Sequence, residues 1–445
     1  MKKMLLTLAL IAGIVSAADA QWVSPNDGST YHLIDLVMIS EGAIVLDDSG
    51  AFLVMQDIIL SDSDILEIAE IDDTNIALKG TSMTIHGTLI VDSPTWINGS
   101  SGSSMCFDRS ANSIINMTSF SSLGGISLIG SDVVFTGSSF SNFTTEYTSA
   151  AVTYTNCDPT FTFCNFIRNE GAAISSAANA QGSPTISNCK FQGNNTANTN
   201  NPQINLGPGS TKDIVVEGNE ITGEGHNMVG GFSISDVLGV GVTRLIFKNN
   251  SVVANRYGYN QQGDNIYAEI TGNDFLSNDL ETNPMNGGSG VSIYGSTTNC
   301  AAVLRDNTII GNLGGITAIY MHNIDMGTED DWGHNRIYKN MNETGQYALY
   351  NNSSCDITAV GNYWGTTDLV EVEEIIYHKT DDPSLGLVTY NPIWLEDGVE
   401  EISDDVQIND NRVYSIDGRY LGNEVPEDYR GVYIQNGKKY VILNR

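Results

Sequence analysis

The sequence has few basic residues. It contains 20 Lys and Arg against 53 Asp and Glu, which gives a formal net charge of −33 at pH 7. Proteins that bind nucleic acid hold its phosphates with clustered Lys and Arg, so this composition argues against a nucleic-acid partner. The same charge predicts that anionic polysaccharides are repelled unless a cation bridges them to the protein.

Long apolar runs and common catalytic motifs are also missing. After residue 20, no stretch approaches the roughly 20 apolar residues that a membrane-spanning helix needs. Gly-x-Ser-x-Gly, His-Glu-x-x-His, Cys-x-x-Cys and a phosphate-binding loop do not occur. These absences argue against a transmembrane protein and remove the usual signatures of a serine hydrolase, a zinc protease and a nucleotide-binding enzyme.

The first 20 residues have the pattern of a secretory signal peptide. Two Lys precede an apolar run over residues 4–15, and small residues lead to a predicted cleavage site after Ala20. A membrane anchor is the alternative, which the short run disfavours. Cleavage removes two Lys and one Asp, so the mature chain is expected to begin at Gln21 with a charge of −34 and to be extracellular or on the outer cell surface.

A six-residue pattern recurs through the middle of the chain: a small or polar residue, any residue, an apolar residue, any two residues, and often Asn. Two clear copies are Cys-Asn-Phe-Ile-Arg-Asn at 164–169 and Cys-Lys-Phe-Gln-Gly-Asn at 189–194. The steps between copies vary from 20 to 34 residues, as is typical of a solenoid with loops of different length. In ten copies the third position is always apolar: Phe120, Phe140, Phe166, Phe191, Ile221, Val252, Phe275, Ile309, Ile337 and Trp364.

Alternating apolar and polar residues precede the copies, as in Thr-Phe-Thr-Phe at 160–163, and a period of two indicates a β-strand. Such a strand buries its apolar face by stacking on a neighbour about 4.8 Å away, so the repeat predicts parallel coils, with Asn amides bonded from coil to coil. The position three residues before each copy is apolar throughout: Ile115, Phe135, Phe161, Ile186, Val216, Phe247, Ile270, Leu304, Trp332 and Ala359.

These residues resemble the right-handed parallel β-helix proteins of the pectate-lyase-like superfamily, whose coils often carry Asn-x-Phe-x-x-Asn. The resemblance covers residues 105–397 and is most specific in Gly-Asn-Tyr-Trp-Gly at 361–365 and Asn-Pro-Ile-Trp-Leu at 391–395. It implies an all-β fold, a right-handed parallel β-helix with a small C-terminal β-domain. The family includes polysaccharide lyases and hydrolases as well as surface proteins without known chemistry, so the fold leaves the function open.

Four segments are expected: a signal peptide (1–20), an N-terminal cap with the first irregular coils (21–104), the β-helix (105–397) and a C-terminal sorting-type β-domain (398–445). Residues 21–104 alternate apolar and polar residues but lack the hexapeptide, and the end of a solenoid needs a cap. Their acidic clusters at 47–48 and 62–64 are candidate calcium ligands. Solvated turns are the favoured alternative, because the spacing of a calcium loop is incomplete.

The C-terminal residues resemble the sorting tail of Gram-negative type IX secretion substrates. Tyr-Ser-Ile-Asp-Gly-Arg at 414–419 and Gly-Val-Tyr-Ile-Gln-Asn-Gly-Lys-Lys at 431–439 match its two segments. Asn436-Gly437 between alternating runs predicts a β-hairpin. The resemblance implies the secretion machinery as a partner, although the upstream Asn-Pro strand of longer tails is missing. A hairpin that only caps the solenoid is the alternative.

Six cysteines, at 106, 157, 164, 189, 300 and 355, lie in a chain expected to reach an oxidising compartment. Cys164 and Cys189 occupy equivalent positions of successive coils. Those at 157, 300 and 355 share a position but lie at least two coils apart, beyond the reach of a disulfide. The alternatives are a Cys164–Cys189 disulfide and a stacked pair of buried thiols.

The register yields one polar constellation. One hypothesis is a groove in which Arg305, Lys248 and His334 meet a sugar carboxylate or hydroxyls, while an acidic residue acts as base or calcium ligand. The alternative, which we favour, is a ladder of opposite charges on a solvated face. The positions two and four before the hexapeptides, with nearby ones, supply its members: Glu217, Lys248, Glu269, Thr271, Arg305, Asp306, Asp331, His334 and Arg336.

The sequence therefore favours a secreted or cell-surface module that binds or scaffolds carbohydrate over a polysaccharide lyase or glycoside hydrolase. Export signals and exposed strand faces favour binding. Catalytic motifs are missing where enzymes of this fold need them, since Gly-His-Asn at 333–335 is a weak echo of the Gly-His-Gly of pectin hydrolases. We expect a polysaccharide or cell-surface glycan as partner and no cofactor other than calcium.

Overall fold

The computed structural model describes residues 21–69, 73–100, 102–283, 287–320, 322–395, 413–415, 420–426, 431–435 and 438–442. The predicted signal peptide lies outside these ranges. The chain divides into two compact units, Met1–Trp394 and Leu395–Arg445, whereas the predicted boundary lies at 397/398. No helix in the described part of the chain is long and apolar enough to span a membrane.

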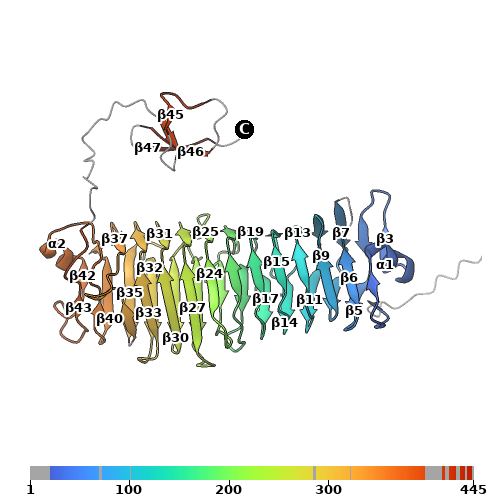
Figure 1. Cartoon of the computed structure of the whole chain (residues 1–445), viewed down its shortest axis with the longest axis horizontal. Helices are drawn as coiled ribbons and strands as arrows, with labels where there is room; N and C mark the ends of the chain where they lie inside the picture. The colour runs from blue at the N-terminus through green and yellow to red at the C-terminus, as the bar shows by residue number, and fades with distance from the viewer. Residues whose placement is uncertain are drawn as a thin grey trace, which may run out of the picture. The chain divides into compact units, whose positions relative to one another are not determined.

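The first unit is a right-handed parallel β-helix, as predicted, and its coils build three long sheets (Figure 1). Sheet A contains, in spatial order, β1 (Gln21–Val23), β5 (Asp57–Leu60), β8 (Ser82–Ile85), β11 (Ser104–Asp108), β14 (Ile126–Ile129), β17 (Ala150–Thr155), β20 (Ala172–Ser176), β23 (Ile204–Leu206), β26 (Phe232–Asp236), β29 (Tyr259–Gly263), β32 (Ser289–Gly295), β35 (Gly314–Tyr320), β40 (Leu349–Ser353) and β42 (Ile376–Tyr377).

The other two sheets follow the same order along the solenoid. Sheet B contains β2 (Thr30–Tyr31), β6 (Ile65–Ile68), β9 (Thr88–Val91), β12 (Ile114–Asn116), β15 (Val134–Thr136), β18 (Thr160–Thr162), β21 (Thr185–Ser187), β24 (Ile214–Glu217), β27 (Thr243–Lys248), β30 (Ile266–Thr271), β33 (Ala301–Arg305), β36 (Asn323–Asp325), β41 (Ile357–Thr358) and β43 (Val388–Thr389). Sheet C contains β3 (Ile44–Leu46), β4 (Phe52–Val54), β7 (Thr74–Leu78), β10 (Thr95–Asn98), β13 (Thr118–Ser121), β16 (Ser139–Ser141), β19 (Asn165–Ile167), β22 (Lys190–Gln192), β25 (Glu220–Thr222), β28 (Ser251–Val253), β31 (Asp274–Leu276), β34 (Thr308–Ile310) and β37 (Arg336–Tyr338).

Short elements complete both units. The first unit also contains α1 (Leu33–Ile39), α2 (Leu369–Glu374) and the hairpin β38 (Met341–Asn342) with β39 (Gly345–Gln346). The second is an antiparallel sheet in the order β45 (Tyr420–Gly422), β44 (Val413–Ser415), β46 (Gly431–Gln435), β47 (Lys438–Ile442). Gln435 pairs with Lys438 across residues 436–437, which lie outside the described part, as do 416–419. The sorting role of this unit stays a prediction.

Sheet C carries the hexapeptide repeat. Its third positions pair from coil to coil in the predicted column, from Phe120 to Ile337, and a bridge between Arg336 and Tyr363 continues the column to Trp364. The parallel pairing starts before the predicted β-helix, because Ser104 and Met105 already pair with strand β8. The coils therefore run continuously through position 104.

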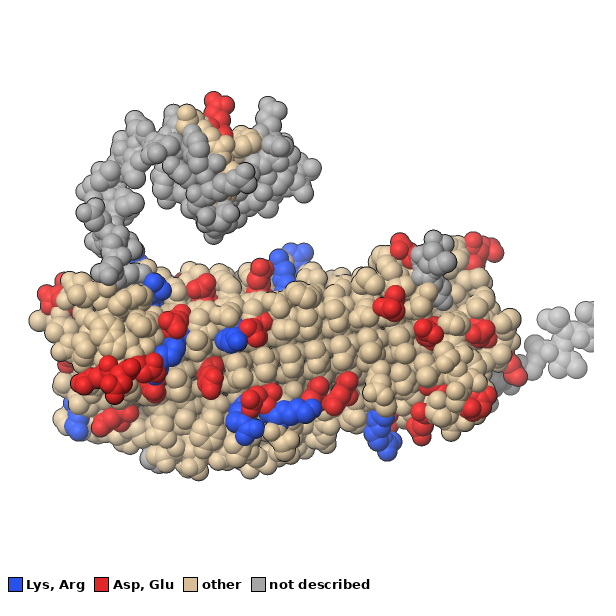
Figure 2. Space-filling model, in the orientation of Figure 1, with Lys and Arg blue, Asp and Glu red and all other residues tan. Residues whose placement is uncertain are grey.

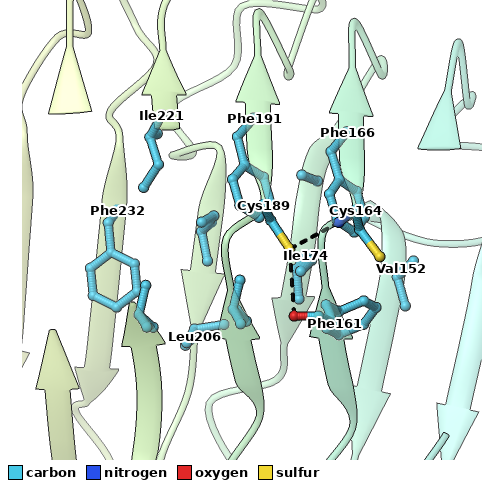
Figure 3. Close-up of a cluster of buried hydrophobic side chains, with 14 of the residues drawn as sticks. Val152, Phe161, Cys164, Phe166, Ile174, Cys189, Phe191, Leu206, Ile221 and Phe232 are labelled. Carbon is cyan, nitrogen blue, oxygen red and sulfur yellow. Dashed lines mark hydrogen bonds between the residues drawn. The ribbon is translucent and has the colours of Figure 1, made fainter. Parts of the chain in front are cut away.

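Stacked aromatic rings fill the centre of the solenoid (Figure 3). The Phe166 ring lies 4.5 Å from Phe140 and 5.0 Å from Phe191, measured between centroids, and both pairs are stacked. All three side chains are fully buried. The sequence places a Phe at one strand position in successive coils, and coil spacing brings the rings to the distance that aromatic pairs prefer.

Sheet B departs from the prediction at one coil. Leu304 and its predecessors occupy the predicted buried column, but Trp332 does not, because β33 pairs with β36 and brings Ala302 opposite Ile324. Two residues further along, the fully buried Met326 takes the core position. Residues 328–332 form an inserted loop between strand and hexapeptide, so the prediction for Trp332 was wrong.

Two buried columns of Asn amides connect the coils, as predicted. In the first column, Asn307 Oδ1 accepts hydrogen bonds from Asn273 N at 3.0 Å and from Asn273 Nδ2 at 2.9 Å. The second column is interrupted at Glu224, where the hexapeptide lacks Asn. There Gln203 bridges the gap: Asn194 Nδ2 donates to its Oε1 at 3.0 Å, and its Nε2 donates to Asn255 Oδ1 at 2.9 Å.

The cysteines are all free thiols in this structure. Cys164 and Cys189 lie on successive coils, and the backbone N–H of Cys164 donates to the Cys189 sulfur at 3.3 Å (Figure 3). The structure therefore has the stacked pair of buried thiols rather than the disulfide.

We expect the stability of the β-helix to depend on pH because His322 is buried. It is fully buried, neither ring nitrogen has a hydrogen-bond partner among the described residues, and burial lowers its pKa to about 4. In the unfolded chain the imidazole of this histidine takes up a proton near pH 6.5. Its contribution to stability is therefore fully present above that pH and is lost as the pH falls toward 4, which lowers the free energy of unfolding by on the order of 3 kcal/mol. We expect the urea midpoint to fall less between about pH 7 and pH 4.5 in His322→Phe than in the wild type. An equal fall would contradict this role for His322.

Candidate functional site

The predicted polar constellation begins on the outer face of sheet B. Glu217, Lys248, Thr271 and Arg305 pair in register on successive coils. Lys248 Nζ lies 3.1 Å from Glu217 Oε1. Figure 2 shows one face of the molecule, on which Lys and Arg side chains lie beside Asp and Glu side chains. Neighbouring coils thus place opposite charges together.

Arg305 is the most heavily bonded member of this constellation. Its Nη2 donates to Asp325 Oδ2 at 2.9 Å and to Asp331 Oδ2 at 2.8 Å, and its Nη1 donates to the backbone carbonyls of Leu304 and Asp325. Only 12% of the Arg305 side chain is exposed. The guanidinium lowers the pKa of Asp331, which lies in the inserted loop rather than on a strand. Asp325 was not among the residues predicted for this constellation.

Of the remaining predicted residues, His334 is close enough to Asp331 for its charge to help lower the pKa of that carboxyl, whereas Glu269 and Arg336 lie in other rows of strands. His334 Nδ1 lies 3.9 Å from Asp306 Oδ1, and Arg336 is on strand β37 of sheet C, with its guanidinium 4.7 Å from the Trp394 ring centroid. Glu269 lies in a neighbouring row of sheet B and lines a hollow of about 210 Å³. The geometry is that of the charge ladder we favoured, and sugar binding by these residues stays a prediction.

The outer face of sheet A carries a second surface, which the sequence analysis did not single out. One outward position pairs through successive coils and holds an uncharged residue in each, which we call the polar row. Its members are Thr84, Cys106, Ser127, Thr153, Ser175, Asn205, Ser233, Asn260, Ser292, Thr317, Tyr350 and Tyr377.

Three adjoining hollows lie over the later part of the polar row. Their volumes are about 410, 380 and 370 Å³; the first two share Thr317 and Ile319, and the last two share Asn352. One wall of these hollows is formed by the chain segments that lead into the strands of sheet A, and it includes Asn200, Tyr257 and Tyr347. We call this continuous depression, from strand β23 to β40, the sheet A groove.

Several amides in the groove are available to a ligand. The side chains of Asn205, Gln262 and Asn352 make no hydrogen bond to any residue that the structure describes. Asn260 uses only its Nδ2, which donates to Ser233 Oγ at 3.0 Å. Because an amide both donates and accepts, the groove offers both kinds of partner to a hydroxyl-rich molecule.

Tyrosines gather toward the C-terminal end of the groove. Tyr294 and Tyr320 meet edge to face with centroids 5.0 Å apart, and 56% of Tyr320 is exposed. The ring centroids of Tyr350 and Tyr377 lie 4.9 Å apart. Each ring presents an apolar face and a polar hydroxyl, which suits the face and the edge of a sugar ring.

The groove is almost free of charge. Arg256 is the only charged residue among its described lining residues; it is 8% exposed, and its guanidinium donates to Asn200 Oδ1. Burial raises the pKa of Tyr257 to about 12, so its phenol is neutral at physiological pH. The sheet A groove is therefore almost neutral, although the chain as a whole is acidic.

Sheet A escaped the sequence analysis because its strands have no fixed distance from the hexapeptide. The connecting turns vary in length, so the repeat aligns sheets B and C but not sheet A. A signal was present: hydroxyl or amide residues alternate with apolar ones in Phe-Ser-Ile-Ser at 232–235 and Val-Ser-Ile-Tyr at 291–294, without a charge.

Carboxylates of the acidic clusters in the N-terminal region accept hydrogen bonds within turns and between neighbouring segments. Asp47 Oδ1 accepts from the backbone N–H of Ser49 and Ala51, and Asp64 accepts from Ser24 Oγ and from the N–H of Gly28. In the part of the chain that the structure describes, no three His, Cys, Asp or Glu side chains gather as a metal-ion site. Calcium binding stays a prediction.

Comparisons with known proteins agree with this architecture. Residues 259–368 match a family described as "Protein of unknown function (DUF1565)", and no curated protein matches. A mutant of the periplasmic alginate epimerase AlgG is 11% identical, with a TM-score of 0.50 over 82% of this chain and 83% of that one. A mannuronic acid specific polysaccharide family 6 lyase from human gut microbiota is 12% identical over 84% and 88%, with a TM-score of 0.34. The likeness to the epimerase shows a shared right-handed parallel β-helix.

Proposed function

We propose that this protein binds carbohydrate through the sheet A groove. The observation that carries the proposal is the uncharged polar row, with free amides beside it and tyrosines at one end, over three adjoining hollows. Binding sites for small polar ligands combine a concave surface with a few polar groups that fix orientation. Sugar hydroxyls match the amides, and sugar rings match the tyrosines.

The lining of the groove favours binding over catalysis. Hydrolysis of a glycosidic bond uses a pair of carboxyl groups, and the described lining residues include neither a carboxylate nor a histidine. A lyase needs a base, and the phenol of Tyr257, with its pKa of about 12, holds its proton at neutral pH. A polysaccharide lyase or hydrolase remains the second candidate, supported by the fold that this chain shares with an alginate epimerase.

The proposed site of action is the cell surface or the extracellular space. Support comes from the pattern of residues 1–20 and from the resemblance of the C-terminal segments to a sorting tail. The predicted partners are a polysaccharide and, for export, the secretion machinery. Intact-mass analysis of secreted protein is expected to give a chain that begins at Gln21; a retained segment 1–20 would contradict the cleavage prediction.

A panel of soluble polysaccharides tests the proposed function. The mature protein is expected to be retarded by at least one polymer in affinity electrophoresis, without new reducing ends and without the absorbance of unsaturated ends. Turnover that is lost in Arg305→Ala or His334→Ala would establish the enzyme alternative and return the site to sheet B. No retention by any polymer would contradict carbohydrate binding.

Tyr350→Ala is expected to weaken glycan binding about tenfold, because it removes an aromatic face at the end of the groove, a loss of roughly 1.4 kcal/mol. The matched control is Tyr267→Ala, which removes a tyrosine that is 42% exposed on strand β30 of sheet B. Dissociation constants of both variants for the same oligosaccharide provide the comparison. Equal losses, or a loss in the control alone, would place binding outside the groove.

A further inference from the structure

We infer that the ligand of the sheet A groove is an uncharged polysaccharide rather than a polyuronate. The inference rests on the proposed function and adds the chemical class of the ligand. It concerns the distribution of charge over the faces of the solenoid, the reach of the groove and the state of its single arginine.

In the coils that form the groove, the strands of sheet A lack exposed charge, whereas the strands of sheet B do not. Strands β24, β27, β30, β33 and β36 of sheet B contain six charged residues: Glu217, Arg244, Lys248, Glu269, Arg305 and Asp325. The strands of sheet A beside them, β23, β26, β29, β32 and β35, contain one, Asp236, which is 1% exposed. The same coils therefore carry charge on one outer face and exclude it from another.

A polyuronate would lack a counter-charge in this groove. The formal charge of the chain is −33, so a negative polymer approaches against the field of the whole molecule. Each carboxylate would also lose hydration on entering a hollow without a free cation, which is unfavourable unless it is paired. Arg256 is largely covered and bonded to Asn200, and the described lining residues supply no carboxylate to share a bridging calcium ion.

The groove suits a polymer rather than a single sugar. From Asn205 on β23 to Tyr350 on β40 the polar row crosses five coil steps, which is about 24 Å at roughly 4.8 Å per step. Hydroxyl, amide and phenol groups repeat along this length without a charge. A chain of neutral sugars that runs along the solenoid meets a hydrogen-bonding group at each coil.

Polymers that differ only at one carbon test the inference. Full-length mature protein is titrated with soluble β-1,4-manno-oligosaccharides and β-1,4-mannurono-oligosaccharides of equal length, and with the corresponding gluco- and glucurono- pair, each with and without calcium. We expect at least about tenfold tighter binding to the neutral member of one pair, with little dependence on salt.

The outcomes separate the inference from the proposed function. Equal binding, or tighter binding of the uronate with or without calcium, overturns the uncharged ligand and leaves carbohydrate binding in place. No binding to any member, repeated across the wider polysaccharide panel, overturns both. A substitution in the groove tests whether charge causes the preference. Thr317→Lys is expected to raise affinity for the uronate at least about threefold, whereas Thr317→Gln is not. No gain in Thr317→Lys, with the fold retained by circular dichroism, would count against the inference.

Discussion

Phe166→Asp is expected to unfold the β-helix at room temperature or to abolish soluble expression. Phe166 is fully buried between the stacked rings of Phe140 and Phe191. Truncation of a buried Phe costs about 3–5 kcal/mol, and the buried carboxylate adds several more. The total, on the order of 6 kcal/mol or more, is comparable to the whole stability of many domains.

Phe163→Asp is the matched control for this substitution. Phe163 lies three residues earlier, is 61% exposed and has a φ of 55°, a backbone conformation that Asp tolerates better than Phe. Thermal unfolding followed by far-UV circular dichroism is expected to leave the control within about 0.5 kcal/mol of the wild type. A stable, folded Phe166→Asp protein would contradict the assignment of the Phe column to the core.

Asn307→Ala is expected to destabilise the β-helix by on the order of 3–6 kcal/mol. The substitution removes the acceptor of Asn273 N and Asn273 Nδ2, and the donor to the carbonyl of Ile270 at 2.8 Å. Asn307 is fully buried, and its Nδ2 also donates to Asn335 Oδ1 at 2.8 Å, so four buried polar groups lose a partner. Asn273 Nδ2 and Asn335 Oδ1 each keep another partner, whereas Asn273 N and the Ile270 carbonyl lose this one at about 1–3 kcal/mol each. The cost exceeds that of the lost side chain because the neighbouring coil keeps the unpaired groups.

Asn352→Ala provides the comparison, since Asn352 is exposed and has no side-chain hydrogen bond to a described residue. Urea unfolding of both variants, followed by tryptophan fluorescence, is expected to change the midpoint strongly in Asn307→Ala and little in Asn352→Ala. Similar midpoints in the two variants would mean that the Asn column contributes little to stability.

The repeat made two of the three sheets predictable. Third positions such as Phe166 and preceding positions such as Leu304 keep a fixed separation, so the buried columns of sheets B and C follow from the sequence. The prediction failed at Trp332, where an inserted loop moves the strand upstream and Met326 takes the core position. Gln203 was also beyond prediction, because it reaches the Asn column from outside the hexapeptide.

The candidate site was less predictable than the fold, for a physical reason. Charged residues such as Lys248 and Arg305 stand out in a sequence, yet stacking of coils pairs them with Glu217 and Asp331 and satisfies their charges. The uncharged residues of the sheet A groove form a surface only when six strands of variable spacing stack in register. Ser292 and Asn260 become neighbours through strand pairing, which no local pattern specifies.

The most direct test of the central claim places the same bulky residue on two outer faces. Ser292→Trp fills the sheet A groove, and Val303→Trp enlarges a residue that is 36% exposed on strand β33 of sheet B. Isothermal titration with the neutral oligosaccharide that the wild type binds is expected to give at least about a tenfold loss for Ser292→Trp and wild-type affinity for Val303→Trp. Unchanged binding by folded Ser292→Trp, together with a loss in Val303→Trp, would contradict the assignment of the binding surface to the sheet A groove.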